Sequence, residues 1–110
     1  MGLLLENAVF RELYRRYGNI YSQNVYYSED VNSACDFVVY LDGGVPLPVQ
    51  VSWSINDPVT RHREIRGLVK ACQTAQVKTG WILTGDEDEE FEEAGIKVMV
   101  MAAWRWMIER

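Results

Sequence analysis

The sequence lacks several features that would place it in common protein classes. No segment approaches the roughly 18 uninterrupted apolar residues of a membrane span, and Glu6 and Asn7 interrupt the N-terminal apolar stretch too early for a secretory signal. The two cysteines, Cys35 and Cys72, are too few for a disulfide framework and do not have metal-ligand spacing. These absences predict a cytoplasmic chain with no membrane segment and with reduced, buried thiols.

Positive charge is also scarce. Lysine and arginine together number 11 against 16 aspartates and glutamates, which gives a net charge of -5. Overall electrostatics therefore cannot hold the chain on nucleic acid, and any such contact must use a local basic patch. The sequence has no GxxxxGK[ST] phosphate loop for a nucleotide. Its only histidine, His62, lies in the charged run "TRHRE", which favours a solvated helix residue over a catalytic one.

Much of the acidity lies in one run, "GDEDEEFEE", from Gly85 to Glu93. This composition predicts a solvated loop and the start of a helix, because carboxylates suit the positive end of a helix dipole. A metal-binding loop is the alternative, but the run lacks the Asp/Asn alternation and the central glycine of a calcium loop.

The apolar pattern predicts three helices and five strands in one domain, for which 110 residues provide one core. Helices are expected over 3–17, from 58 to about 78, and in the C-terminal segment "AAWRWMIER". Strands are expected over 20–29, 35–42, 46–53, 80–86 and 96–101, with a hairpin between the second and third. Pro46 and Pro48 confine the start of the third strand to an edge or an irregular lead-in.

Three polar positions stand out within these apolar elements. Glu6 lies four residues before Phe10, on the apolar stripe of the first helix. Asp36 and Gln50 lie in the two strands of the expected hairpin, and Ser52 shares a strand face with Gln50. We expect Glu6, Asp36 and Gln50 to converge as oxygen ligands at one end of the sheet.

Six segments of the sequence together resemble a known protein family. The segments that carry the resemblance are, in order, "LLENAVFREL", "YYSEDVNSACDFVVYL", "VQVSW", "TRHREIRGL", "WILTGDED" and "AAWRWMI". They are similar to the restriction-endonuclease-like, or PD-(D/E)XK, fold found as the C-terminal domain of archaeal-type P-loop ATPases. The resemblance implies an α/β fold with a central mixed β-sheet of about five strands flanked by helices, in the order α-β-β-β-α-β-β-α. It implies a single domain over 1–110 that forms the C-terminal part of a longer ATPase.

The resemblance also assigns roles to the polar residues. Active members are nucleases that hold magnesium or manganese on carboxylates and activate water. Glu6 matches the acid of the first helix, Asp36 the motif aspartate, and Gln50 the second acid, where the amide carbonyl can still bind metal. Ser52 stands in place of the motif lysine.

Serine carries no charge, and losing one preorganised donor from such a site costs about 2.7–4 kcal/mol of barrier. Catalysis then depends on a substitute cation from the second helix, for which the candidates are Arg61, Arg63 and Lys70.

We therefore expect a nuclease-fold accessory domain of an archaeal-type ATPase, with a degenerate catalytic centre, that docks on DNA or on protein. Its partner is the ATPase module, in cis or in trans. Two alternatives remain open: a residual metal-dependent DNA endonuclease, and a pure interaction module that forms a homo-oligomer through an aromatic strand or the C-terminal helix.

A purely structural role for the polar residues also stays open. In that case Asp36 pairs with a helix arginine, Gln50 satisfies backbone groups, and Glu6 pairs with Arg63 or Arg66. Core packing is the preferred role for the four tryptophans, over base stacking.

Overall fold

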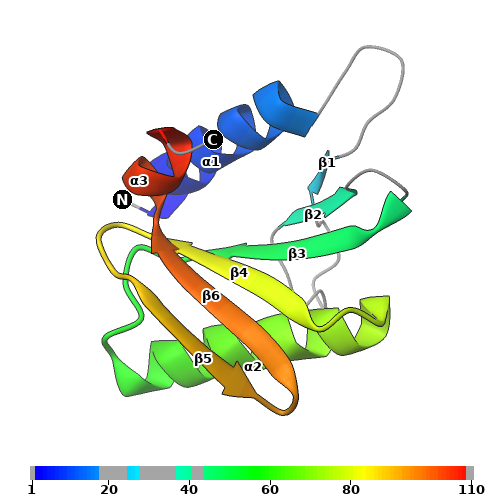
Figure 1. Cartoon of the computed structure of the whole chain (residues 1–110). Helices are drawn as coiled ribbons and strands as arrows, with labels where there is room; N and C mark the ends of the chain where they lie inside the picture. The colour runs from blue at the N-terminus through cyan, green and yellow to red at the C-terminus, as the bar shows by residue number, and fades with distance from the viewer. Residues whose placement is uncertain (1, 18–24, 28–36, 41–43, 109–110) are drawn as a thin grey trace.

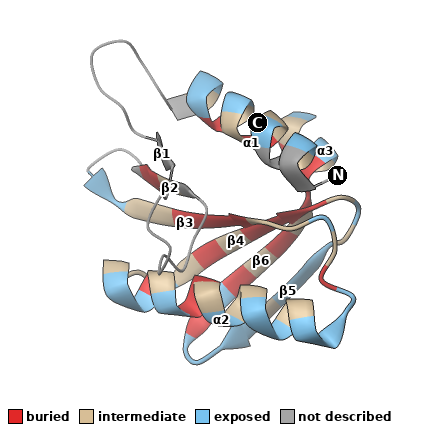
Figure 2. Ribbon diagram, turned by 180° about the vertical axis from the view of Figure 1, so that it is seen from behind, coloured by how far each residue is buried: buried red, intermediate tan, exposed pale blue. Residues whose placement is uncertain are grey.

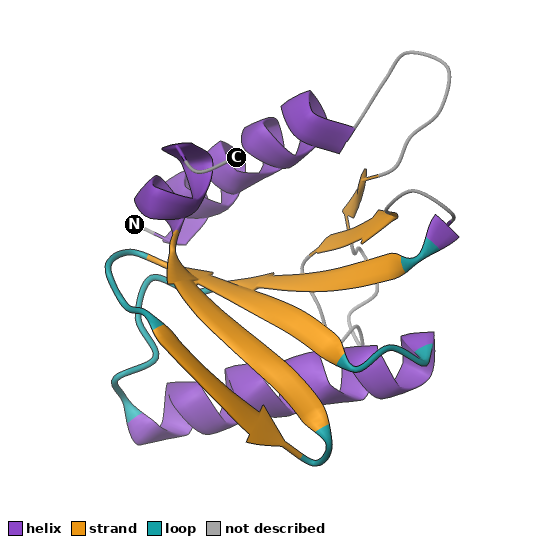
Figure 3. Cartoon of the chain, in the orientation of Figure 1, coloured by secondary structure: helices purple, strands orange, loops and turns teal. Residues whose placement is uncertain are grey.

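Six strands form one mixed sheet between helices in a computed structural model of the chain, which describes residues 2–17, 25–27, 37–40 and 44–108. α1 (Gly2–Tyr17) and α3 (Ala103–Ile108) cover one face, and α2 (Pro58–Ala75) covers the other (Figures 1 and 3). The strands are β1 (Val25–Tyr27), β2 (Phe37–Tyr40), β3 (Pro46–Val51), β4 (Thr79–Thr84), β5 (Glu89–Glu93) and β6 (Ile96–Ala102). The expected α/β class, a mixed sheet flanked by helices, is confirmed.

The strand order is β1-β2-β3-β4-β6-β5. β1, β2 and β3 are antiparallel neighbours, so the expected hairpin between β2 and β3 is confirmed. β4 then runs parallel to both β3 and β6. Because a parallel pair needs a crossover connection, α2 links β3 to β4 across one face of the sheet.

Pro46 and Pro48 both lie inside β3. β2 pairs with the strand along Pro46–Val49, whereas β4 pairs with it from Val49 onward. The two prolines therefore occupy the half of β3 that has a strand on one side, where a missing N–H is tolerated. The expectation of an edge holds for this half, while the second half, with Gln50, is interior.

The acidic run departs from the prediction. Glu89–Glu93 is strand β5 rather than the start of a helix, so the described residues form a sheet of six strands where about five are expected. Ala94 and Gly95, with φ of 52° and 79°, make the two-residue turn into β6. Phe91 supplies the apolar position of β5, because it pairs with Val98 and packs on the buried cluster beneath α2. One aromatic residue among four glutamates is too weak a pattern to reveal a strand in the sequence alone.

The start of α2 follows the sequence signal. The Asp57 carboxylate accepts a hydrogen bond from the Thr60 backbone N–H at 2.9 Å, and Pro58 occupies the first turn. The helix ends at Gln76, which adopts a left-handed conformation with φ of 60°. This end comes slightly before the expected Lys78.

Two apolar clusters lie on the two faces of the sheet. Figure 2 shows buried residues along the central strands β3, β4 and β6. The α1/α3 cluster contains Val9, Leu13, Val39, Val49, Leu83, Ala103 and Trp106. The α2 cluster contains Ile55, Leu68, Val69, Cys72, Ile82, Ile96, Val98 and Val100. None of the helices in the described part of the chain has the length and apolar character that a membrane crossing requires.

The cysteine and tryptophan predictions are met in part. Cys72 is a free, fully buried thiol, and burial raises its pKa to about 11; Cys35 lies outside the described residues. Trp106 is buried and meets Trp81 edge to face, with ring centroids 6.4 Å apart. Trp53 and Trp104 are 47% and 58% exposed, so the prediction of core packing is wrong for these two.

Candidate functional site

Gln50 forms a buried polar pair with a helix carboxylate. Its side chain is 6% exposed, and its Nε2 donates a hydrogen bond to Oε2 of Glu64 on α2 at 2.9 Å. The neighbouring Val49 and Val51 pack in the α1/α3 cluster, so alternation along β3 turns Gln50 to the α2 face. We call these two residues the Gln50–Glu64 pair.

Glu64 is not among the residues predicted from the sequence, although its position on the apolar stripe of the second helix could have identified it. Glu64 lies four residues before Leu68 and eight before Cys72, both of which α2 buries. It therefore falls on the buried stripe of the helix, and 16% of its side chain is exposed. The same stripe argument that selects Glu6 on the first helix also selects Glu64.

Ser52 is engaged in the chain reversal that follows β3. Its N–H donates to the Leu83 carbonyl at 3.0 Å, and its Oγ donates to the Ser54 carbonyl at 3.0 Å. No lysine or arginine in the described part of the chain forms a hydrogen bond with Ser52. The hydroxyl thus serves the local turn at the position where the resemblance expects a cation.

The expected convergence of Glu6 with Asp36 and Gln50 stays a prediction. Asp36 and the side chain of Glu6 lie outside the described residues. The backbone of α1 lies on the face of the sheet opposite the Gln50–Glu64 pair. A contact between Glu6 and Gln50 would therefore have to pass around the end of the sheet.

The three candidate cations occupy different places along α2. Arg61 donates two hydrogen bonds to the Glu89 carboxylate, at 2.7 and 2.8 Å, and stacks 5.2 Å from the Phe91 ring centre. These hydrogen bonds raise the pKa of Arg61 and lower that of Glu89. Arg61 is thereby held toward β5.

The other two candidates are more open to solvent. Arg63 is 69% exposed, and its Nη2 lies 3.6 Å from Oε1 of Glu64. Lys70 is exposed and forms no ion pair within the described ranges. Arg63 is thus the candidate cation closest to the Gln50–Glu64 pair.

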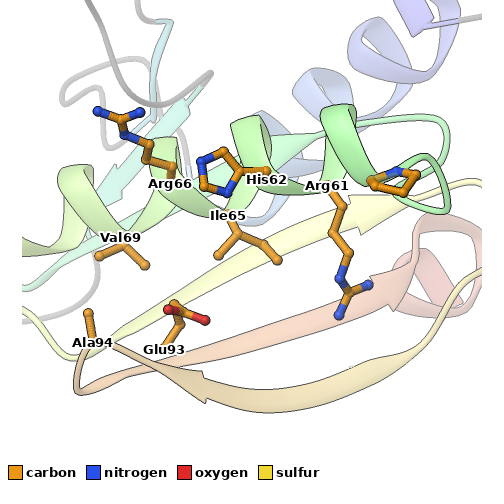
Figure 4. Close-up of a pocket in the computed structure, with 8 residues that line it drawn as sticks. Arg61, His62, Ile65, Arg66, Val69, Glu93 and Ala94 are labelled. Atoms are coloured by element: carbon orange, nitrogen blue, oxygen red, sulfur yellow. The ribbon is translucent and has the colours of Figure 1, made fainter.

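A groove of about 370 Å³ lies between α2 and the end of β5 (Figure 4). Ile65 and Val69 point from α2 into it, and Glu93 and Ala94 lie across from them. Pro58, Arg61, His62 and Arg66 complete the lining. We call it the α2/β5 groove. The sequence does not predict it, because one of its walls belongs to the unpredicted strand.

The Gln50–Glu64 pair offers an amide oxygen and a carboxylate, which are oxygen ligands of the kind that magnesium takes. Within the described residues, no three histidine, cysteine, aspartate or glutamate side chains gather as a metal-binding group. A complete metal site on this face would need the further carboxylates that the resemblance assigns to Asp36 and Glu6.

Two comparisons with known proteins each match nearly the whole chain. Residues 1–104 match the family model of the domain of unknown function DUF4143. The uncharacterized protein MJ1544 of Methanocaldococcus jannaschii is 27% identical over an alignment of 113 positions, which covers 97% of this chain and 25% of that protein. The chain thus spans about a quarter of the length of this relative. No solved structure matches the chain with significant similarity.

Proposed function

We propose that this chain, which belongs to the DUF4143 family of domains of unknown function, is a nuclease-fold accessory domain with a degenerate catalytic centre that serves as a docking module. The observation that carries the proposal is the Gln50–Glu64 pair. At the position of the second acid stands an amide that donates to Glu64 instead of a free carboxylate. The resemblance to the PD-(D/E)XK fold supplies the comparison.

The chemistry of the site supports loss of catalysis. An amide brings no negative charge to a metal ion, and the Ser52 hydroxyl donates to a backbone carbonyl in its own turn. Arg61, one of the candidate substitute cations, is held by Glu89 on β5. In the part of the chain that the structure describes, no lysine or arginine hydrogen-bonds Ser52, where the resemblance expects a charge-stabilising donor worth about 2.7–4 kcal/mol of barrier.

The docking role rests on the size of the relative and on exposed apolar groups. In MJ1544 the matching region is joined to about three times as much additional polypeptide. Trp53, Trp104 and Ile108 are exposed here, and large apolar side chains of this kind are enriched in the centres of protein interfaces. The resemblance makes an ATPase module, in cis or in trans, the proposed partner.

One observation favours a residual metal-dependent endonuclease as a second candidate. Glu64 brings a carboxylate to within 2.9 Å of the Gln50 amide, so a carboxylate is present next to the position from which the resemblance expects one. If Glu64 replaces the missing acid, magnesium could still bind on this face, with Arg63 as the nearest cation.

Nicking of supercoiled and single-stranded DNA with magnesium or manganese separates the two candidates. We expect no more product than in a metal-free control. Metal-dependent cleavage that disappears in Asp36→Ala or Glu64→Gln, but persists in Glu92→Gln, would overturn the degenerate centre. Glu92 is a suitable control because its exposed carboxylate lies on β5, away from the Gln50–Glu64 pair.

Docking needs a separate measurement. We expect the 110-residue chain to bind a purified archaeal-type ATPase module added in trans, and light scattering reports whether the chain also self-associates. A monomer that binds neither DNA nor the ATPase module contradicts both the docking role and the interaction-module alternative.

A further inference from the structure

We infer that the outer edge of β5 and the α2/β5 groove together bind an extended segment of another polypeptide, which joins the sheet as a further strand. The segment would alternate apolar residues with lysine or arginine. This inference rests on the proposed docking function and names the surface and the chemistry of the partner.

β5 is the last strand of the sheet. It pairs with β6 along its whole length, from Glu89 opposite Val100 to Glu93 opposite Ile96. On its other side β5 has no strand neighbour within the described residues. The backbone N–H and C=O groups along this edge are the template on which an added strand forms hydrogen bonds.

The two faces of β5 differ in character. Phe91 pairs with Val98 of the α2 cluster, so Glu89, Phe91 and Glu93 face α2. Glu90 and Glu92 face the opposite side. A strand added beside β5 would present alternate side chains to these two environments.

On the α2 face, the added strand would lie along the α2/β5 groove. Ile65 and Val69 form its apolar wall (Figure 4). Phe91 of β5 packs, like Ile65, against the α2 cluster. Of the two carboxylates on this face of β5, Glu89 already accepts both hydrogen bonds from Arg61, and Glu93 lies at the end of the groove, across from Ile65 and Val69. Apolar side chains of the partner that lie against Ile65 and Val69 gain by burial.

On the opposite face, the neighbours of the added strand would be carboxylates. Glu92 is exposed, and no ion pair to it is formed among the described residues. Glu90 pairs at 3.0 Å with Lys97, and both of these side chains remain more than half exposed. Opposite charges in cross-strand positions attract, so lysine or arginine suits this face of the partner.

The same carboxylates act against a second copy of the chain as the occupant. Antiparallel pairing of two β5 edges would place glutamates opposite glutamates, and like charges in cross-strand positions destabilise a sheet. The edge thus rejects its own copy while it accepts a strand of opposite charge. This selectivity favours a basic partner over self-association.

Binding of synthetic peptides to the 110-residue chain, followed by fluorescence anisotropy, tests the inference. The probe is a nine-residue peptide in which valine and lysine alternate. One control has the same composition with its lysines and valines in two separate blocks, and the other replaces each lysine with glutamate. We expect the alternating peptide to bind about tenfold more tightly than either control. Equal binding of the block peptide would reveal a charge contact without strand geometry, and would overturn the inference.

A matched pair of variants locates the contact. Glu92→Lys should weaken binding of the alternating peptide by about tenfold, because it turns an attractive cross-strand pair into a repulsive one. Asp86→Lys makes the same charge change in the exposed loop before β5 and should change binding less than about twofold at moderate salt. Equal losses in the two variants would contradict a site on β5.

The outcome is separable from that of the proposed function. β5 lies at the end of the sheet, whereas Gln50 lies on β3, on the far side of β4 and β6. Peptide binding can therefore fail while the cleavage assay still shows a degenerate centre, and DNA cleavage can be found while β5 still binds the peptide.

Discussion

The two faces of the sheet differ in the polar groups that lie beside their apolar clusters. The α1/α3 face buries an entirely apolar cluster around Leu13, Leu83 and Trp106. The α2 face buries a cluster of similar size, but with the Gln50–Glu64 pair in the same layer and the α2/β5 groove at its margin. At the rim of the first face, Arg16 stacks 4.4 Å from the Trp106 ring centre and donates to the Trp106 carbonyl.

This difference bears on the proposed site. Taking an amide and a carboxylate out of water costs free energy, and their mutual hydrogen bond only offsets this cost. Apolar side chains of the same volume would stabilise the fold at least as well. Among the described residues, the α2 face combines apolar packing with the buried polar pair and the groove on which the two proposals rest.

The largest expected effect tests whether both faces carry the fold. Leu13→Ala on α1 and Leu68→Ala on α2 each empty a fully buried position, and each should lower the free energy of unfolding by about 3 kcal/mol. Urea denaturation measures the loss. Leu4→Ala, at an exposed position of α1, is the control and should stay within about 0.5 kcal/mol of the original chain. A loss below 1 kcal/mol for Leu68→Ala alone would show that α2 is dispensable to the core.

A smaller effect is expected from the pair that distinguishes the α2 face. Glu64→Ala removes the acceptor of the buried Gln50 amide and should destabilise the chain by about 2 kcal/mol in the same urea assay. Glu64→Gln keeps an acceptor of similar shape and should lose less than half as much. Lys70→Ala alters an exposed position of the same helix that forms no ion pair among the described residues, and it controls for helix propensity. Equal losses for Glu64→Ala and Lys70→Ala would mean that the pair contributes no stability.

The smallest expected effect lies on the rim of the α1/α3 face and depends on pH. The hydrogen bond from Arg15, with a second from Arg16, lowers the pKa of Glu12 from 4.5 to about 2 against the opposing effect of burial. Because the folded-state pKa is depressed, this contribution is present above pH 4.5 and is lost as the pH falls toward 2. Screening by solvent limits it to about 1 kcal/mol.

Glu12→Gln isolates that contribution. Its deficit in unfolding free energy relative to the original chain should be full at pH 6 and should shrink steadily between pH 4.5 and pH 2.5. Other carboxylates with lowered pKa, such as Asp57 and Glu89, act equally in both proteins and cancel in the difference. A deficit that does not change with pH would assign the role of Glu12 to packing rather than to charge.

The elements with strong periodicity could be predicted from the sequence. α1, α2, β3, β4 and β6 all lie where the apolar pattern places them, because burial of one face fixes the period of the side chains. β5 could not be predicted in this way, since it has one apolar residue and is formed by pairing with β6 and by its turn at Ala94. The α2/β5 groove was hidden for the same reason.

In the candidate site, too, one part could be predicted from the sequence and another part could not. Alternation along β3 was enough to single out Gln50 as a polar residue in an apolar strand, and in the structure its side chain is buried. Its partner could not be named, because Glu64 comes 14 residues later and reaches Gln50 only when α2 crosses back over the sheet. The position of Arg61 was equally hidden, since Glu89 and Phe91 hold it from a strand that the sequence did not reveal.

By itself the sequence determined which residues must be buried and in which local period, because the removal of apolar surface from water acts on every segment through its own side chains. Tertiary structure decided which distant groups meet: the crossover that puts Glu64 on Gln50, and the strand order that leaves β5 at the edge. Contacts between distant residues depend on the connections between elements and on which strands become neighbours. Both are properties of the whole fold rather than of any one segment.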